Sequence, residues 1–169
     1  MTSNIRKFLL VPFLIVVLLS HGALASRTPK VSFEKILGQT TDAARYLCVS
    51  VERDPSLETV SFLLERKGEP FQGKAPVNFA LSIPCLFVGL SSQPGCDIFR
   101  QGCEYFLFLK QIPGTSEMQI VGNDVGILRI STDRFGNEFA KSSLIKPISP
   151  ESTEYFQISL DKIENILRP

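Results

Sequence analysis

The most reactive side chains in this sequence are those of one histidine, His21, and four cysteines, Cys48, Cys85, Cys96 and Cys103. The histidine lies in an N-terminal segment that we expect to be removed, so the mature chain would contain none. Without histidine, Ser-His and Cys-His nucleophile pairs, the commonest general base and the nitrogen ligand of most zinc and copper sites are excluded. We therefore predict a protein that is not an enzyme and that holds no metal or other cofactor.

An even number of cysteines in an exported chain predicts two disulfides. A metal site made of all four thiolates is the competing interpretation, but no C-x-x-C pair occurs in the sequence. We expect Cys85–Cys96 to close a loop and Cys48–Cys103 to join the first strand to the fourth. The alternative pairing is Cys96–Cys103 with Cys48–Cys85.

Three acidic residues, Glu104, Glu117 and Asp124, lie in or near the most patterned part of the sequence. A pair of carboxylates could perform acid–base chemistry or bind calcium. No motif fixes their separation, and carboxylates at strand ends are usually solvated or paired, here with Arg129 or Lys110. A carboxylate-dependent hydrolase is therefore an alternative to the binding function proposed below.

The N-terminus has the features of a signal peptide at residues 1–25. Arg6 and Lys7 precede an apolar run over residues 8–19, and Ala23–Ala25 has the small-x-small pattern that precedes cleavage. The apolar run is short for a bilayer span. We expect an exported protein, periplasmic or secreted, with no stable membrane span after cleavage and a single domain at residues 26–169.

Charge sets limits on the partners of the mature chain. Loss of Arg6 and Lys7 leaves 16 basic and 17 acidic residues, a net charge of −1. A nucleic-acid-binding domain normally carries a basic surplus, so we predict no nucleic-acid partner. A protein or a cell-envelope component is the expected partner, and the oligomeric state stays open.

Hydrophobic periodicity predicts mainly short strands, with one small helix at each end. The expected helices span 31–38 and 159–168, the second after a Pro/Ser linker at 146–153, and residues 41–44 could begin a helical turn. The expected strands span 45–53, 59–66, 77–83, 105–109, 118–121 and 125–130, with a weaker strand at 138–145. Tight turns at Pro113–Gly114 and Gly122–Asp124 would join three of them consecutively.

Alternation within the strands predicts which side chains face the core. In the first strand one face carries Leu47, Val49 and Val51, and Cys48 points away from it. In the next two strands the inward residues are Val60, Phe62 and Leu64, then Val77, Phe79, Leu81 and Ile83. The segment Tyr105–Leu109 is apolar on both faces, which is typical of a strand covered on both sides. This pattern favours a compact antiparallel barrel of five to six strands over a sandwich.

The longest irregular stretch spans residues 84–101. It could be a functional loop or a disulfide-closed loop whose apolar residues pack on the core. If this loop binds a partner, its candidate contact residues are Leu86, Phe87, Leu90 and Asp97. A secreted protease inhibitor acting through this loop is a further alternative.

Several motifs resemble those of uncharacterised bacterial exported proteins with a netrin-like (TIMP-like) OB-type barrel. The matching residues are Lys67–Pro70, Gly102, Glu104, Tyr105, Phe108–Leu109, and Gly122 with Gly126. The resemblance implies a small β-barrel without an established activity. TIMP-like inhibitors chelate a protease zinc through an N-terminal cysteine, whereas the expected mature N-terminus here is Ser26, so the resemblance does not imply that mechanism.

Overall fold

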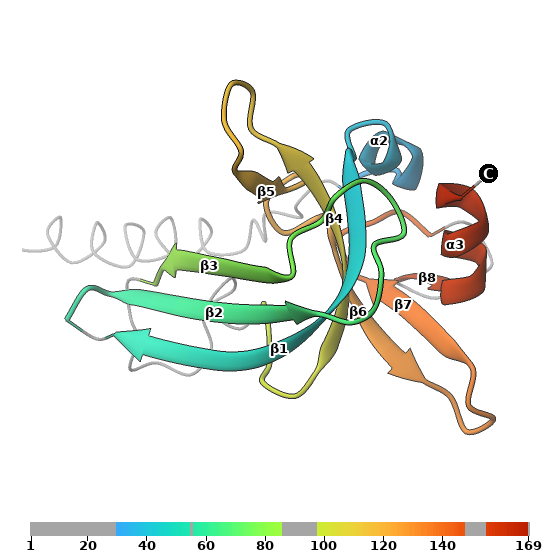
Figure 1. The fold of residues 1–169 in the computed structure, drawn as a ribbon. Coiled ribbons are helices and arrows are strands. Elements are labelled where there is room, and N and C mark those ends of the chain that lie inside the picture. Colours follow the sequence, from blue (N-terminus) through green and yellow to red (C-terminus); the bar gives the residue numbers. More distant parts are fainter. Residues whose placement is uncertain (1–29, 55, 86–97, 148–154, 169) are drawn as a thin grey trace, which may run out of the picture.

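The computed structural model describes residues 30–54, 56–85, 98–147 and 155–168 (Figure 1). The predicted signal peptide, the four candidate loop contacts and Cys96 lie outside these ranges, as does most of the predicted linker. Predictions about those segments therefore stay predictions.

Eight strands and two helices make up the described chain. In order they are α2 (Phe33–Leu37), β1 (Asp42–Asp54), β2 (Thr59–Arg66), β3 (Asn78–Pro84), β4 (Glu104–Gln111), β5 (Met118–Ile120), β6 (Ile127–Thr132), β7 (Glu138–Ser142), β8 (Phe156–Ser159) and α3 (Leu160–Leu167). Both predicted helices are present but are shorter than predicted, and the hydroxyls of Ser32 and Ser159 accept N-cap hydrogen bonds where they begin.

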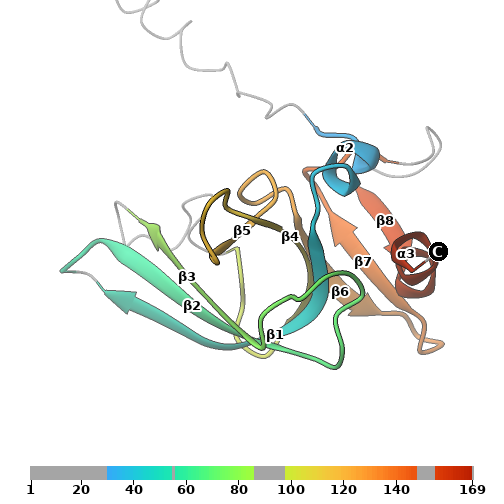
Figure 2. The ribbon, with the colours of Figure 1, turned by 45° about the horizontal axis from the view of Figure 1, so that its top comes forward.

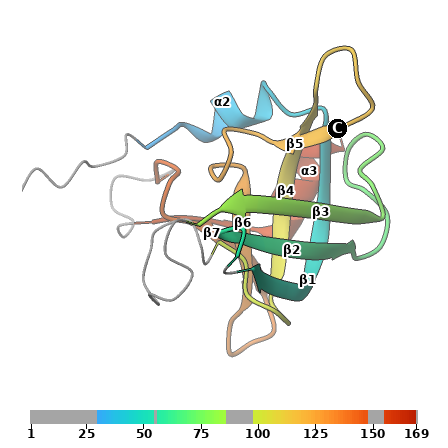
Figure 3. The same ribbon diagram turned by 90° about the vertical axis from the view of Figure 1, so that its left-hand side faces the viewer.

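The strands form one antiparallel sheet in the order β3-β2-β1-β4-β6-β7-β8, with β5 also beside β4. The sheet is not closed into a barrel, so the predicted OB-like barrel is wrong in this respect. β1 is 13 residues long and turns the sheet, so that β2 and β3 run across the direction of β4 (Figures 1 and 3). The described part of the sheet thus ends in two strand edges, at β3 and β8.

The inward face of β1 is the opposite of the predicted one. Tyr46 and Cys48 are fully buried, whereas Leu47 and Val49 are only half-buried. A β-bulge between Cys48 and Ser50 then shifts the register against β2. The predicted helical turn at residues 41–44 is also wrong, because β1 begins at Asp42 and pairs there with β4.

β4 separates two hydrophobic cores, as its two apolar faces predict. Phe106 and Phe108 pack in one core with residues of α2, β8 and α3. Tyr105, Leu107 and Leu109 pack in the other with residues of β2 and β3. Figure 2 shows the two helices on one side of the bent sheet, with β2 and β3 on the other. The helices therefore cover only one face of the β4–β8 part of the sheet.

β5 and β6 are successive parts of one strand path beside β4, not two strands of a meander. Leu109 pairs with Ile120, and Leu107 pairs with Ile127. The chain leaves this path after Ile120 and returns at Gly126, whose N–H donates to the carbonyl oxygen of Val121 at 2.8 Å. The Gly122–Asp124 segment is therefore an excursion from the strand and not the predicted reversal.

The remaining strand predictions had mixed outcomes. Val60, Phe62 and Leu64 are buried in β2 as predicted. Val77 precedes β3 and is 58% exposed, so its predicted burial is wrong. β8 was not predicted, although Phe156 and Ile158 are both buried.

Candidate functional site

One row of paired residues crosses five strands of the sheet. Tyr46 of β1 pairs with Tyr105 of β4, and Tyr105 pairs with Arg129 of β6. Arg129 in turn pairs with Lys141 of β7, which pairs with Gln157 of β8. Residues that pair directly across strands share one face of a sheet. The row therefore changes from buried tyrosines to charged side chains on the face that the helices leave uncovered.

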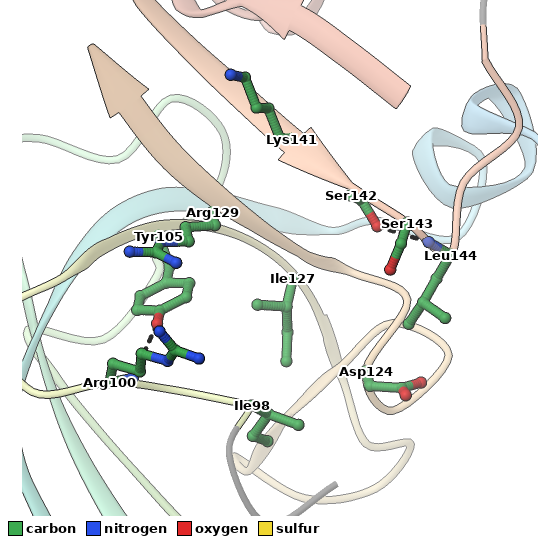
Figure 4. A pocket seen from close by; sticks show the side chains of 10 residues that line it. All are labelled: Ile98, Arg100, Tyr105, Asp124, Ile127, Arg129, Lys141, Ser142, Ser143 and Leu144. Carbon is green, nitrogen blue, oxygen red and sulfur yellow. Dashed lines mark hydrogen bonds between the residues drawn. The ribbon is translucent and has the colours of Figure 1, made fainter. Parts of the chain in front are cut away.

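Arg129 and Lys141 are two cationic residues that pair directly on adjacent strands, and Figure 4 shows the Lys141 ammonium directed away from the Arg129 guanidinium. Arg129 is exposed and Lys141 is half-buried. Like charges in this position destabilise a sheet. Within the described ranges neither side chain has a carboxylate partner, although Arg45 has two.

A pocket of about 280 Å³ lies at this charged end of the row (Figure 4). Its lining residues come from the turn before β4, from β4, from the excursion before β6, and from β6 and β7 with the segment that follows. They are Ile98, Arg100, Tyr105, Asp124, Ile127, Arg129, Lys141, Ser142, Ser143 and Leu144. The described lining thus holds three cations and a single carboxylate.

The turn before β4 positions Arg100 at the pocket. Cys103 donates its N–H to the carbonyl oxygen of Arg100 at 3.1 Å, and Gly102 adopts a φ of +76° that favours glycine. The N–H of Arg100 donates to the hydroxyl oxygen of Tyr105 at 2.8 Å. These contacts fix the backbone of the turn against the sheet, while the guanidinium of Arg100 lies in the pocket (Figure 4).

Tyr105 contributes a hydrogen-bond donor at the base of the pocket. Its side chain is 3% exposed, and its hydroxyl oxygen already accepts the Arg100 N–H. Burial raises the pKa of Tyr105, so the hydroxyl keeps its proton at neutral pH. No acceptor for that proton is found in the part of the chain that the structure describes, so it is available to an anion.

The opposite wall is formed by the segment after β7. The N–H of Leu144 donates to the hydroxyl oxygen of Ser142 at 3.1 Å, which ties this segment to the end of the strand. Asp124 lines the same side, at a distance from the arginines (Figure 4). The pocket is therefore cationic at one end and polar at the other.

The other acidic candidate, Glu104, faces the opposite side of the sheet. It pairs with Arg45, whose Nη2 also lies 2.6 Å from an Oε1 of Glu138. The hydrogen bond from Arg45 lowers the pKa of Glu138, so this carboxylate is ionised at neutral pH. The triad joins β1, β4 and β7. Its role is structural.

The predicted hydrolase pair is therefore not brought together. Glu104 is engaged in this triad, Asp124 lines the pocket, and Glu117 is exposed before β5. The described residues contain no group of three or more acidic, cysteine or histidine side chains that could hold a metal ion.

Cys48 and Cys103 carry free thiols in this structure and lie opposite each other at the junction of β1 and β4. The N–H of Cys48 donates to the carbonyl oxygen of Cys103 at 3.0 Å. The structure thus brings the predicted pair together, while the bond itself stays a prediction. Cys85 is buried, and its predicted partner Cys96 lies outside the described residues.

No protein-family model, curated protein or solved structure matches this chain. Among the described helices none is long and apolar enough to cross a membrane.

Sequence reasoning did not identify the pocket, but one signal for it was available. Arg129 lies just before the turn that the sequence predicts at residues 131–137, and Lys141 lies shortly after it. A predicted hairpin therefore places the two cations near each other on adjacent strands, although it does not fix their direct pairing. The contributions of Arg100 and Ser142 depend on loop conformation and gave no such signal.

Proposed function

We propose that the mature chain is an exported, non-enzymatic binding domain that holds an anionic group of its partner in the pocket at β6 and β7. The partner is a protein or a cell-envelope component that presents a phosphate or a carboxylate. The cross-strand pair Arg129–Lys141 is the observation that carries this proposal. An anion bound beside this pair offsets the excess of positive charge, so the arrangement that weakens the free sheet strengthens the complex.

The other pocket residues support binding of an anion. Arginine offers a planar fork of N–H donors that matches carboxylate and phosphate oxygens. Arg100 and Arg129 provide two such forks from separate elements, and the hydroxyl of Tyr105 adds a neutral donor. The strands that carry Tyr105 and Arg129 are held in the sheet, so these donors need little ordering on binding.

Catalysis has little support by comparison. The expected mature chain has no histidine, and the one acidic residue in the described lining, Asp124, has no second carboxylate beside it. Binding without turnover is therefore the function that the pocket supports best.

Titration with inorganic phosphate, followed by backbone NMR, tests the proposal directly. We expect the shifts to centre on residues 100, 129 and 141, and Arg129→Gln to weaken binding about tenfold, as for loss of a charge-assisted contact. Arg134→Gln is the matched control, because Arg134 lies in the β6–β7 turn over the ring of Phe135 and does not line the pocket. Equal affinity in both variants, or shifts elsewhere, would contradict the proposal.

The class of partner is then separated by two further probes. Vesicles containing anionic phospholipid present phosphate as an envelope surface does, whereas a short acidic peptide presents carboxylates as a protein does. The probe that competes with phosphate, and that binds more weakly to the Arg129→Gln variant, shows whether the partner's anionic group is a lipid phosphate or a protein carboxylate. Competition by neither probe would leave phosphate as a small-molecule ligand and would contradict the macromolecular partner.

We also propose a relationship to the netrin-like exported proteins, and it rests on the sequence motifs alone. Gly102 and Gly126 act here in a turn and in a close strand approach, which are structural roles. The open sheet differs from the barrel that the resemblance implies.

A further inference from the structure

Cys48 and Cys103 face each other directly across two strands. Leu47 pairs with Glu104, so the next residues along the ladder are these two cysteines. Cys48 donates its N–H to Cys103, and its carbonyl oxygen accepts the N–H of Gly102 at 2.8 Å. Gly102 and Cys103 together oppose Cys48, which is the arrangement of a bulge with a positive-φ glycine in first position.

Both thiols lie on the face of the sheet that carries the row described above. Cys48 follows Tyr46 by two residues, and Cys103 precedes Tyr105 by two residues, so each shares a face with its tyrosine. Consistent with this, the Cys103 thiol is one cause of the raised pKa of Cys48, after burial. Directly paired residues of antiparallel strands have Cα atoms about 4.5–5.5 Å apart, which is within the Cα range that a disulfide spans.

Cys103 also forms hydrogen bonds with both arginines of the pocket. The Nη2 of Arg129 donates to the Sγ of Cys103 at 3.5 Å. The N–H of Cys103 donates to the carbonyl oxygen of Arg100 in the adjoining turn. A displacement of Cys103 on oxidation would therefore alter the contacts of two of the three cations that line the pocket.

We propose that Cys48 and Cys103 form a disulfide that increases the affinity of the pocket for anions. The inference rests on the proposed function, because the pocket is the same site. Oxidation draws the Cys103 sulfur into a bond with Cys48 and so weakens the hydrogen bond that this sulfur accepts from Arg129. It also fixes the end of the Arg100 turn to β1, so less ordering is needed when an anion binds.

The reaction requires an oxidant, which we identify as a small-molecule disulfide of an oxidising compartment. The half-buried Cys103 meets the oxidant first, because Cys48 is fully buried. The thiolate of Cys103 attacks the oxidant and releases one thiol, and Cys48 then attacks the mixed disulfide and releases the second. Two S–H bonds are lost, one S–S bond forms, and the oxidant leaves as two thiols that carry both protons.

Trypsin digestion without reduction identifies the pairing. Cys48 lies in the tryptic peptide 46–53, Cys103 lies in 101–110, and Cys85 and Cys96 share the peptide 75–100. The proposed bond links 46–53 to 101–110 and leaves 75–100 separate. Either of the other two pairings joins all three peptides. That product, or a free thiol at Cys48 after treatment with oxidised glutathione, would overturn the proposal.

Phosphate titration of the oxidised and the reduced full mature chain tests the coupling. We expect the oxidised form to bind about three- to tenfold more tightly, as gains from preorganisation usually do. The variant Cys48→Ser with Cys103→Ser should bind alike under both conditions. Equal affinities of the two wild-type forms would overturn the coupling while leaving the pocket intact. Absence of phosphate binding in both forms would instead overturn the proposed function, and the peptide map would still report on the disulfide.

Discussion

Replacing Lys141 with glutamine should stabilise the fold and weaken anion binding at the same time. The substitution removes one charge of the cross-strand pair with Arg129 and keeps a side chain of similar length. Most surface substitutions change the free energy of unfolding by less than about 0.5 kcal/mol, in either direction. A gain in stability coupled to a loss of affinity is therefore a specific signature of cations held together for a ligand.

The size of the stabilisation follows from the register. Directly paired residues place their Cβ atoms about 5 Å apart, and long side chains can move their charges to about 7 Å. Coulomb repulsion at that distance is about 0.6 kcal/mol in water, and screening at physiological salt reduces it to about 0.3 kcal/mol. Partial burial of Lys141 increases the effect. We expect a stabilisation of about 0.5 kcal/mol in dilute buffer, falling as salt is added.

Urea unfolding at low and high sodium chloride measures this effect. Lys110→Gln is the matched control, because Lys110 is equally half-buried and pairs with the neutral Gln119. We expect the control to change neither the midpoint nor its salt dependence. Phosphate titration of the same proteins should show a loss of affinity for Lys141→Gln alone.

Two results would refute the reasoning. If Lys141→Gln were less stable than the wild type at low salt, Arg129 and Lys141 would not repel each other in the folded protein. If it were more stable but bound phosphate as well as the wild type, the repulsion would be real and unrelated to a ligand.

Two further substitutions test the framework that holds the pocket. Gly126→Ala should destabilise the fold by about 2 kcal/mol or more in urea unfolding, because the added Cβ would lie 2.8 Å from the carbonyl oxygen of Phe108; an unchanged midpoint would show that this approach is not tight. Glu138→Gln should cost stability at pH 7, and the difference from the wild type should shrink as pH falls below 4.5, the ordinary pKa of the group. The pairing with Arg45 lowers the folded-state pKa, so its contribution is present above the unfolded value and is lost on acidification; a difference that is constant with pH would contradict this role.

The strands with a clear apolar pattern, on one face or on both, were predicted well from sequence. In β2 the alternation of Val60, Phe62 and Leu64 with polar residues leaves one choice of inward face. In β4 the uninterrupted apolar run required cover on both sides, and the structure supplies it with helices on one face and strands on the other.

The face of β1 was mispredicted for a physical reason. Leu47, Val49 and Val51 are more apolar than Tyr46 and Cys48, so hydropathy favours the wrong set. Burial of Tyr46 is compensated by a hydrogen bond from its hydroxyl to the carbonyl oxygen of Pro76 at 2.8 Å. That acceptor comes from a distant loop, and no local pattern indicates it. Burial also raises the pKa of Tyr46 to about 12, which keeps the donor protonated.

The closed barrel was mispredicted because strand count does not determine closure. The periodicity indicates strands and their number, but closure depends on whether the two ends of the sheet meet. Here β8 extends one end and packs with α3, and its four residues Phe156–Ser159 lie between the predicted linker and the start of the predicted helix, where so short an alternation does not indicate a strand by itself. An extra edge strand of this kind is decided by tertiary packing.

Arginines on the two faces of the sheet have different partners, and this difference is the strongest argument that the pocket has a ligand. Arg45 receives two carboxylates from strands β4 and β7, so this fold can neutralise a half-buried cation where the role is structural. The sequence has 17 acidic and 18 basic residues, so carboxylates are not scarce. On the opposite face, Arg129 has only a sulfur atom as its hydrogen-bond acceptor within the described chain, and Lys141 adds a second charge beside it. Selection for stability alone would favour a carboxylate at either position, which points to a negative charge supplied by a partner.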